Sequence, residues 1–414
     1  MRRPQRTLST LRAGVAAAVL MTVVSRTQGQ CAYDLQIIGD PQCPWAFALT
    51  PLAIDDEGVI VGWGAPCGSN TQRAFRWSAD DGLTFLSLGP GMSTSNAVDV
   101  LEDGTIVGWG ATGLFAVRKG FVWKDGVVQV IAPSDPAIWV DVEGAMADGT
   151  VVGYLTTPSN VYAFLWKDGS FLPLPKDLAL PGVAVGKPSR NGWVNAAIAS
   201  VRFTSVFAWS ELLTVATPLP KGHLGPEPRA ANCRGETIGR VFLVPPEQPL
   251  IGYDRIYRWN GAAMEIIGPP PGFDVVSPRG MNDVGQIVGQ AYCKYTPPDC
   301  AGTAVLWQNG MYIDFADLLP STLVGGVYIA TAINNRGQVV VHGWATNQGS
   351  LFLFTPNPPP GDVDIDCRVG LSDLGFVLEN WGPVDINSVA RADLDGSGIV
   401  DAVDLALVLG NWTP

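Results

Sequence analysis

Short apolar strands alternate with polar turns along the chain, and the clearest unit spans residues 282–310. Its first segment, Asn282-Asp283-Val284-Gly285, favours a tight turn, because Gly and Asn adopt positive φ at low steric cost. The apolar runs 286–289 and 304–307 predict two short strands. Asn309-Gly310 follows the second run and predicts a hairpin turn. One unit is therefore three or four short antiparallel strands.

The unit recurs seven times, with turn glycines 43 to 52 residues apart. These glycines are Gly58, Gly104, Gly149, Gly192, Gly235, Gly285 and Gly337. An aromatic residue ends the next strand of each copy: Trp77, Trp123, Trp166, Trp209, Trp259, Trp307 and Phe354. No single unit can bury its own apolar face, so this period predicts blades stacked around an axis.

The two ends of the array indicate how it closes. The seventh copy stops after Phe354-Thr355-Pro356, without a fourth strand, and residues 33–39 form an orphan strand at the start. We expect this first strand to complete the last blade, which would leave no exposed edge. The predicted fold of residues 31–356 is an all-β seven-bladed β-propeller.

Residues 1–30 have the pattern of a signal peptide. Arg2, Arg3, Arg6 and Arg12 precede the apolar run 13–24, and small residues follow. This run is too short to span a bilayer and no other is long enough, so we expect no membrane span. The predicted localisation is secreted, either extracellular or at the cell surface.

Charge excludes one class of partner. Residues 1–30 hold five of the 26 basic residues and none of the 38 acidic ones, so the formal charge of residues 31–414 is −17. A general nucleic-acid surface needs a basic footprint, which this composition does not provide. We therefore expect no nucleic-acid partner.

The seven cysteines suit an oxidising compartment. Cys293 and Cys300 flank one loop of the sixth unit and predict a local disulfide. Two further disulfides could form among four others, with the pairing left open: Cys31, Cys43, Cys67 and Cys233. Irregular cysteine spacing and only two histidines argue against zinc.

The repeats resemble the bacterial extracellular family named for its His-Ala-Phe tripeptide, the HAF repeats, over roughly residues 46–356. The resemblance rests on the Asn/Asp-x-Gly-x-Ile-Val-Gly run and on Ala-Phe-x-Trp, as in 73–77 and 162–166. The naming histidine is absent from every copy. The resemblance implies an extracellular location and this architecture, but no chemistry.

A Pro-rich linker, residues 357–360, separates the array from an acidic tail. Residues 361–414 contain ten acidic and two basic residues. The segment 393–404 has the spacing of a calcium loop, with oxygen ligands at positions 1, 3, 5, 7, 9 and 12. These ligands are Asp393, Asp395, Ser397, the Ile399 carbonyl, Asp401 and Asp404, and Gly398 provides the sharp turn at position 6.

A second such loop lies 31 residues upstream, at 362–373. Its ligands would be Asp362, Asp364, Asp366, the Arg368 carbonyl and Asp373. Cys367 replaces the glycine of position 6, and Gly370 removes the side chain of position 9. The sequence therefore predicts two Ca²⁺ sites, of which the 393–404 loop binds more tightly.

Each loop leads into a predicted helix, 374–381 or 405–412, and both end in Asn-Trp. The duplicated loop and helix resemble a type I dockerin domain, which implies a small all-α module with two halves about a pseudo-twofold axis. The resemblance also implies a cohesin-like partner or another surface receptor. The residues that would recognise it are Leu371, Ser372, Ala402 and Val403.

The sequence predicts the function of this chain less directly than its fold. Neither His223 nor His342 accompanies a nucleophile or metal motif. The acids before the turn glycines are predicted to form turns: Asp55, Asp56, Asp103, Asp148 and Asp283. Trp63 and Trp109 are candidates for stacking on a glycan, because only two copies have a Trp there.

These observations predict a secreted, non-catalytic binding or surface-attachment protein. The alternative is a carbohydrate-active enzyme, a polysaccharide hydrolase with paired carboxylates on one face of the propeller.

Overall fold

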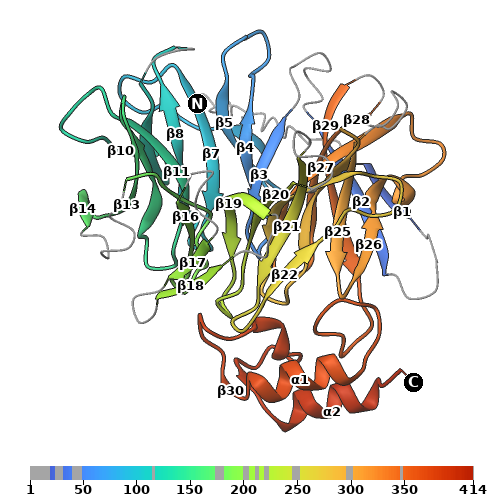
Figure 1. The fold of residues 1–414 in the computed structure, drawn as a ribbon. Helices are drawn as coiled ribbons and strands as arrows, with labels where there is room; N and C mark the ends of the chain where they lie inside the picture. Colours follow the sequence, from blue (N-terminus) through green and yellow to red (C-terminus); the bar gives the residue numbers. More distant parts are fainter. Residues whose placement is uncertain are drawn as a thin grey trace, which may run out of the picture.

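The computed structural model describes residues 19–23, 31–39, 49–113, 117–172, 181–198, 205–209, 214–218, 223–244, 252–294, 302–345 and 348–413. The described strands form six four-stranded antiparallel sheets, one five-stranded sheet and one two-stranded sheet. The six four-stranded sheets and the five-stranded sheet surround a common centre as a β-propeller, with the tail at one end (Figure 1).

Each four-stranded blade is built from consecutive strands. Blade 1 contains β3 (Thr50–Ile54), β4 (Ile60–Gly64), β5 (Arg73–Ser78) and β6 (Gly82–Phe85). Blade 2 contains β7 (Thr94–Val100), β8 (Ile106–Ala111), β9 (Lys119–Lys124) and β10 (Val127–Ile131). Blade 3 contains β11 (Trp139–Ala145), β12 (Val151–Thr156), β13 (Val161–Lys167) and β14 (Ser170–Leu172). Blade 4 contains β15 (Val183–Val185), β16 (Val194–Ile198), β17 (Ser205–Trp209) and β18 (Thr214–Pro218). Blade 5 contains β19 (His223–Ala231), β20 (Thr237–Leu243), β21 (Tyr253–Trp259) and β22 (Met264–Ile267). Blade 6 contains β23 (Val275–Met281), β24 (Ile287–Tyr292), β25 (Thr303–Gln308) and β26 (Met311–Asp314), followed by the 3₁₀ helix η1 (Phe315–Leu318).

The five-stranded sheet, here called the composite sheet, joins both ends of the array. Its strand order is β1 (Val19–Val23), β2 (Ala32–Ile38), β29 (Gln348–Asn357), β28 (Val339–Ala345) and β27 (Gly325–Ile333). The predicted pairing of the first strand with the last repeat is confirmed, since β2 lies antiparallel to β29 with Leu35 opposite Phe354. The strand β1 falls within the predicted signal peptide, so cleavage there would leave β2 as the outer strand.

The predicted fold class of seven blades followed by a separate all-α domain is wrong. The described residues form six regular four-stranded blades, and the remaining sheet is the composite one. The last repeat has only three strands of its own, so its outer edge is covered by strands from the start of the chain.

The tail is neither all-α nor separate from the propeller. It contains α1 (Leu371–Glu379), α2 (Ala402–Gly410), the 3₁₀ helix η2 (Ala390–Ala392) and a two-stranded sheet of β30 (Gly382–Pro383) and β31 (Ile399–Val400). Its apolar core includes Cys233 and Val284, which belong to propeller turns. Two small helices bury little surface alone, so packing against the propeller completes their core.

Local sequence chemistry accounts for the turns and strands of the blades. All seven turn glycines have positive φ, between 74° at Gly337 and 99° at Gly192. The Asn309-Gly310 turn has positive φ at both residues, 50° and 81°, as the predicted hairpin requires. Five aromatic residues that end the third strand of a repeat are buried in the core: Trp77, Trp166, Trp259, Trp307 and Phe354.

The turns between the first two strands of each blade also connect neighbouring blades. The Nδ2 atoms of Asn232, Asn282 and Asn334 donate to the backbone carbonyls of the next turn, at Asn282, Asn334 and Asp55. In a second series, a backbone N–H group of one turn donates to a side-chain oxygen in the turn of the next blade: Cys233 to Asp283, Asp283 to Asn335, Asn335 to Asp56, and Asp56 to Glu102. We call these two series the turn ladder.

The turn-forming prediction for the acids is confirmed at Asp55, Asp103 and Asp148, which accept backbone N–H groups of their own turns. Asp56 and Asp283 instead accept from the preceding blade. Sequence reasoning missed this second role because it depends on which turns become neighbours in the ring.

Blades 2 and 3 have no asparagine at the ladder position, and an ion cluster takes its place. Arg190 of the fourth repeat donates to both carboxylate oxygens of Asp99, at 2.7 and 3.0 Å, and to the carbonyls of Val100 and Ala145. Lys187 lies 2.7 Å from the same carboxylate. Burial raises the pKa of Asp99, but the two positive charges outweigh it and hold this pKa well below its usual range.

The cysteines pair differently from the expectation. Cys31 forms a disulfide with Cys367, and Cys233 is free and buried, so the proposed pairing among four cysteines is wrong for these two. Cys293 is disulfide-bonded, but Cys300 lies outside the described residues. Within the described part of the chain, no helix is long and apolar enough to cross a membrane.

Candidate functional site

The acidic loops of the tail bring carboxylates together as their spacing predicts. The side chains of Asp362, Asp364 and Asp373 have oxygen atoms within 4.8 Å of one another. The side chains of Asp393, Asp395 and Asp404 form the equivalent group in the second loop. Clustered carboxylate oxygens are hard donors that suit a divalent cation such as Ca²⁺. The arrangement can therefore hold a metal ion at loop positions 1, 3 and 12.

Hydrogen bonds give both loops the same local structure. The carboxylate of Asp404 accepts from the backbone N–H groups of Leu394, Asp395 and Asp401. Asp373 accepts in the same way from Val363, Asp364 and Gly370. The last acid of each loop thus caps the following helix while it closes the loop.

The remaining predicted ligands stand outside these carboxylate groups. Asp401 accepts from the Val403 N–H and caps α2, and Asp366 accepts from the Arg368 N–H. Ser397 donates its hydroxyl to the carbonyl of Ile399, so positions 5 and 7 contact each other. The structure therefore brings three predicted carboxylate ligands of each loop together, at positions 1, 3 and 12.

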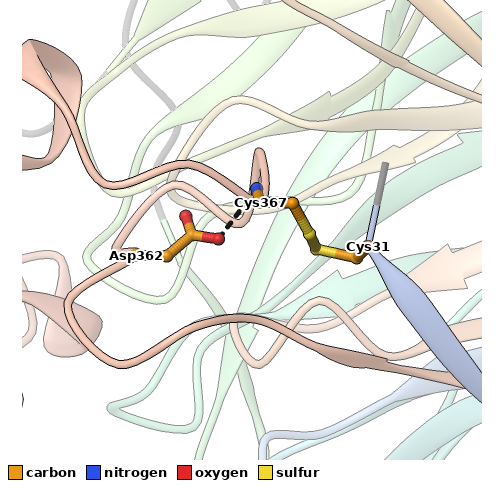
Figure 2. Close-up of side chains that lie close together, drawn as sticks. All are labelled: Cys31, Asp362 and Cys367. Carbon is orange, nitrogen blue, oxygen red and sulfur yellow. Dashed lines mark hydrogen bonds between the residues drawn. A yellow bond between two sulfur atoms is a disulfide. The ribbon is translucent and has the colours of Figure 1, made fainter. Parts of the chain in front are cut away.

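The upstream loop is also anchored to the propeller. Ile365 and Cys367 have positive φ, 61° and 70°, where the downstream loop has Gly396 and Gly398. Such backbone costs on the order of 1 kcal/mol or more for residues with a Cβ. Both side chains connect to the propeller, because Ile365 packs into its core and Cys367 is bonded to Cys31. Figure 2 shows this disulfide beside Asp362, which accepts the Cys367 N–H.

Burial makes the two loops electrostatically different. Burial and repulsion from neighbouring carboxylates raise the pKa of Asp362 to about 8 and that of Asp364 to about 6. Asp395 of the downstream loop is exposed. A bound cation would favour the charged form of these carboxylates and offset the cost of bringing them together.

The predicted partner-binding residues lie on the first turns of the two helices. Leu371 and Val403 are 78% and 51% exposed, which is unusual for large apolar side chains. Leu371 and Ser372 also border a groove between α1 and blade 5, which Arg234 and Phe376 line. Ala402 is exposed at the matching position of α2.

A β-bulge in the first strand of a blade leaves one residue without a partner, and at Leu52, Arg279 and Thr331 this residue lines the central channel. The register shifts between Val142 and Gly144 in β11, and between Pro278 and Gly280 in β23. The strand opposite carries the glycine of the Ile-Val-Gly run. A Cβ on Gly153 would lie 2.1 Å from the Asp141 carbonyl oxygen. This glycine therefore lets the bulged strand approach closely.

The bulge positions carry charged groups that sequence reasoning missed. They are Glu143, Arg229 and Arg279, each three residues before the first residue of a turn. Burial raises the pKa of Glu143 to about 7, despite the opposing charge of Arg229. The fixed offset from the turn is a signal that could have located these residues.

The tryptophans proposed for ligand stacking are less open than expected. The guanidinium of Arg118 lies 4.3 Å from the ring centroid of Trp109, so it covers one face of that ring. Arg118 also pairs with Asp141. Trp63 is half-buried at the equivalent position of blade 1. The geometry therefore does not favour Trp109 as a free platform.

Comparisons with known proteins identify the fold alone. A scan against protein-family models finds no match, and a search of curated proteins finds none. The oligogalacturonate lyase of Vibrio parahaemolyticus aligns with a TM-score of 0.53 and 11% identity over 82% of this chain and 98% of that chain. An oligogalacturonate lyase in complex with manganese also gives 0.53 and 11%, over 82% and 96%. The β-propeller domain of the Trilobed protease from Pyrococcus furiosus gives 0.50 and 11%, over 75% and 93%.

Proposed function

We propose that this chain is a secreted binding or surface-attachment protein whose tail takes up Ca²⁺. The observation that carries the proposal is the duplicated carboxylate group, with three acidic side chains within 4.8 Å in each loop. Without a cation, these like charges repel each other and oppose the folded loop. Calcium binding would therefore stabilise the tail and its contact with the propeller.

The tail would act as the docking element. Its dockerin-like loops and the exposed first-turn residues of α1 and α2 support contact with a cohesin-like partner or another surface receptor. The Cys31–Cys367 disulfide supports an oxidising compartment, as secretion requires. The propeller would then present its channel, or an outer face, to a glycan.

The alternative, a carbohydrate-active enzyme, also has one supporting observation. Glu143 is the unpaired residue of the bulge in β11, and its pKa of about 7 suits a general acid or base near neutral pH. The oligogalacturonate lyases share the propeller fold. Incubation with acidic and neutral polysaccharides, followed by assays for reducing ends and unsaturated products, separates an enzyme from a binder.

Calorimetric titration of the chelator-treated full chain tests the calcium proposal. We expect two Ca²⁺ binding events and much weaker binding of Mg²⁺, which prefers stricter octahedral geometry. Asp404→Ala should remove the tighter event and Asp373→Ala the weaker one. Asp385→Asn, a tail acid outside both loops, is the matched control. Absence of binding in the wild-type chain would reject the proposal, and tighter binding by the upstream loop would reject the ranking.

A further inference from the structure

The residues at the bulge positions differ around the channel, and the charged ones are adjacent. Three residues before each turn, the chain has Leu52, Val98, Glu143, Gly186, Arg229, Arg279 and Thr331. Blade 4 contributes glycine there, and its backbone lies against that of Arg229, with the Lys187 N–H donating to the Arg229 carbonyl at 2.8 Å. The charged positions therefore occupy one side of the channel.

Two of these arginines have unused hydrogen-bonding capacity. Arg279 forms no ion pair or hydrogen bond with any residue that the structure describes. Arg229 pairs with Glu227 at 3.1 Å, but its Nε is buried and has no acceptor in the described region. A buried donor without an acceptor is costly, and it marks a place where a ligand could bind.

A third arginine completes a cleft of positive charge. Arg229, Arg240 and Arg279 line one cleft together with Ser277, Gln290 and Tyr292. The acids among their ion-pair partners are Glu227 and Asp254, both paired with Arg240. Three guanidinium groups therefore face two carboxylates, in a protein whose formal charge is −12. Glu143 also interacts with Arg229, so the positive charge left without a carboxylate partner in the described region is that of Arg279.

The cleft opens at the end of the blades away from the tail. Val284, in the turn of blade 6, packs into the tail core. Tyr292 pairs with Val275 at the other end of β23 and β24, and it lines the cleft. Arg279 borders both this cleft and the central channel. A ligand could therefore enter without displacing the tail.

We propose that this cleft binds the carboxylate of an acidic saccharide, such as a uronic acid unit, through the guanidinium groups of Arg279 and Arg229. The proposal rests on the binding role proposed above and names its ligand class. A planar guanidinium matches a carboxylate with two parallel hydrogen bonds. Ser277 and Gln290 can bind sugar hydroxyls.

The charge distribution favours one carboxylate over a multiply charged anion. Glu143 lies close enough to Arg229 for the two charges to interact, and it would repel a dianion. Arg229, Arg240 and Arg279 line the cleft together, so their like charges repel one another. A single negative charge beside Arg279 would relieve that repulsion.

Calorimetric titration of the full chain with galacturonate oligomers tests the site, with neutral galactose oligomers and inorganic sulfate as comparisons. We expect the uronate oligomers to bind, and Arg279→Gln to weaken this binding about ten-fold or more, as for one lost charge-assisted contact. Arg336→Gln is the matched control, because Arg336 is exposed and pairs only with Glu57 among the described residues. Arg279 is also exposed, so its variant should keep the wild-type melting temperature.

Three outcomes would overturn the proposal: no uronate binding, equal binding by Arg279→Gln and wild type, or sulfate binding as tight as uronate. A Ca²⁺ titration of the same samples separates this result from the proposed function. Intact Ca²⁺ binding without uronate binding removes only the cleft assignment.

Discussion

At the scale of single residues, a glycine on one strand decides which side chain reaches the channel. In five blades the glycine two residues after the start of the second strand faces a bulge, and a Cβ there would lie 2.0 to 2.2 Å from backbone, at Gly62, Gly108, Gly153, Gly239 and Gly289. The bulge leaves one residue of the facing strand without a partner, as with Glu143. That position carries charge at a cost to stability, which is common where a site is built.

The cost at Glu143 should appear in the pH dependence of stability. Burial raises its pKa from 4.5 to about 7, with Arg229 and Asp141 as the charged neighbours. Between these values the folded protein binds more protons than the unfolded chain, so stability falls as pH rises. Glu143→Gln should therefore be more stable than wild type at pH 8, by on the order of 1–3 kcal/mol, and similar at pH 4.

Urea unfolding at the two pH values measures this difference. Glu57→Gln is the control, because the Glu57 side chain is 68% exposed. An identical pH dependence in Glu143→Gln and wild type would contradict the expectation.

At the scale of elements, the blades are joined by their turns as well as by their apolar faces. The turn ladder runs from blade 5 through blade 6 and the composite sheet to blades 1 and 2. Where asparagine is absent, Arg190 and Lys187 hold Asp99. The fourth repeat looks degenerate in sequence because it carries this ion cluster in place of the ladder residues.

Asp99→Asn should test the ion cluster. Asp99 is fully buried, and removing its charge leaves Lys187 and Arg190 without a counter-ion. Loss of one partner of a buried ion pair typically costs about 3–5 kcal/mol. The matched control is Asp81→Asn, because Asp81 pairs with Arg76 at the surface and should contribute less than about 1 kcal/mol. Equal chemical denaturation midpoints for the two variants would show that the cluster does not hold the blades.

At the scale of the whole molecule, one covalent bond joins the start of the propeller to the upstream acidic loop of the tail. Cys31 and Cys367 are 336 residues apart in sequence. Cys31 precedes β2, which pairs with the last repeat, and Ile365 packs into the same core. Closure of the ring and the shape of the upstream loop are therefore linked.

The double variant Cys31→Ser, Cys367→Ser should weaken both the closure of the ring and the folded shape of the upstream loop. We expect a loss of about 2–5 kcal/mol in unfolding free energy, the usual range for removing a native disulfide. Ca²⁺ binding by the upstream loop should also weaken, because no disulfide then holds position 367 in the left-handed conformation that Cys367 has in the wild type. The downstream loop provides the internal control. Unchanged affinity at both loops, measured by calorimetry, would show that ring closure and metal binding are independent.

The sequence by itself determined the local features of this protein. The turn glycines, the hairpin at Asn309-Gly310 and the two acidic loops each depend on residues a few positions apart, so composition and spacing specify them. The strand pairing of β2 with β29 was also predictable, because the last repeat lacks a strand and the first one has no partner.

Only the tertiary structure decided the contacts between distant segments. Cys31 is bonded to Cys367 because ring closure brings β2 beside the tail. No local sequence pattern predicts a pairing across 336 residues. Arg229 and Arg279 face one cleft because adjacent blades carry bulges at the same depth. The composite sheet and the packed tail also depend on tertiary contacts. An open sheet edge needs a partner strand, and a small core needs a neighbouring surface, and the folded ring supplies both.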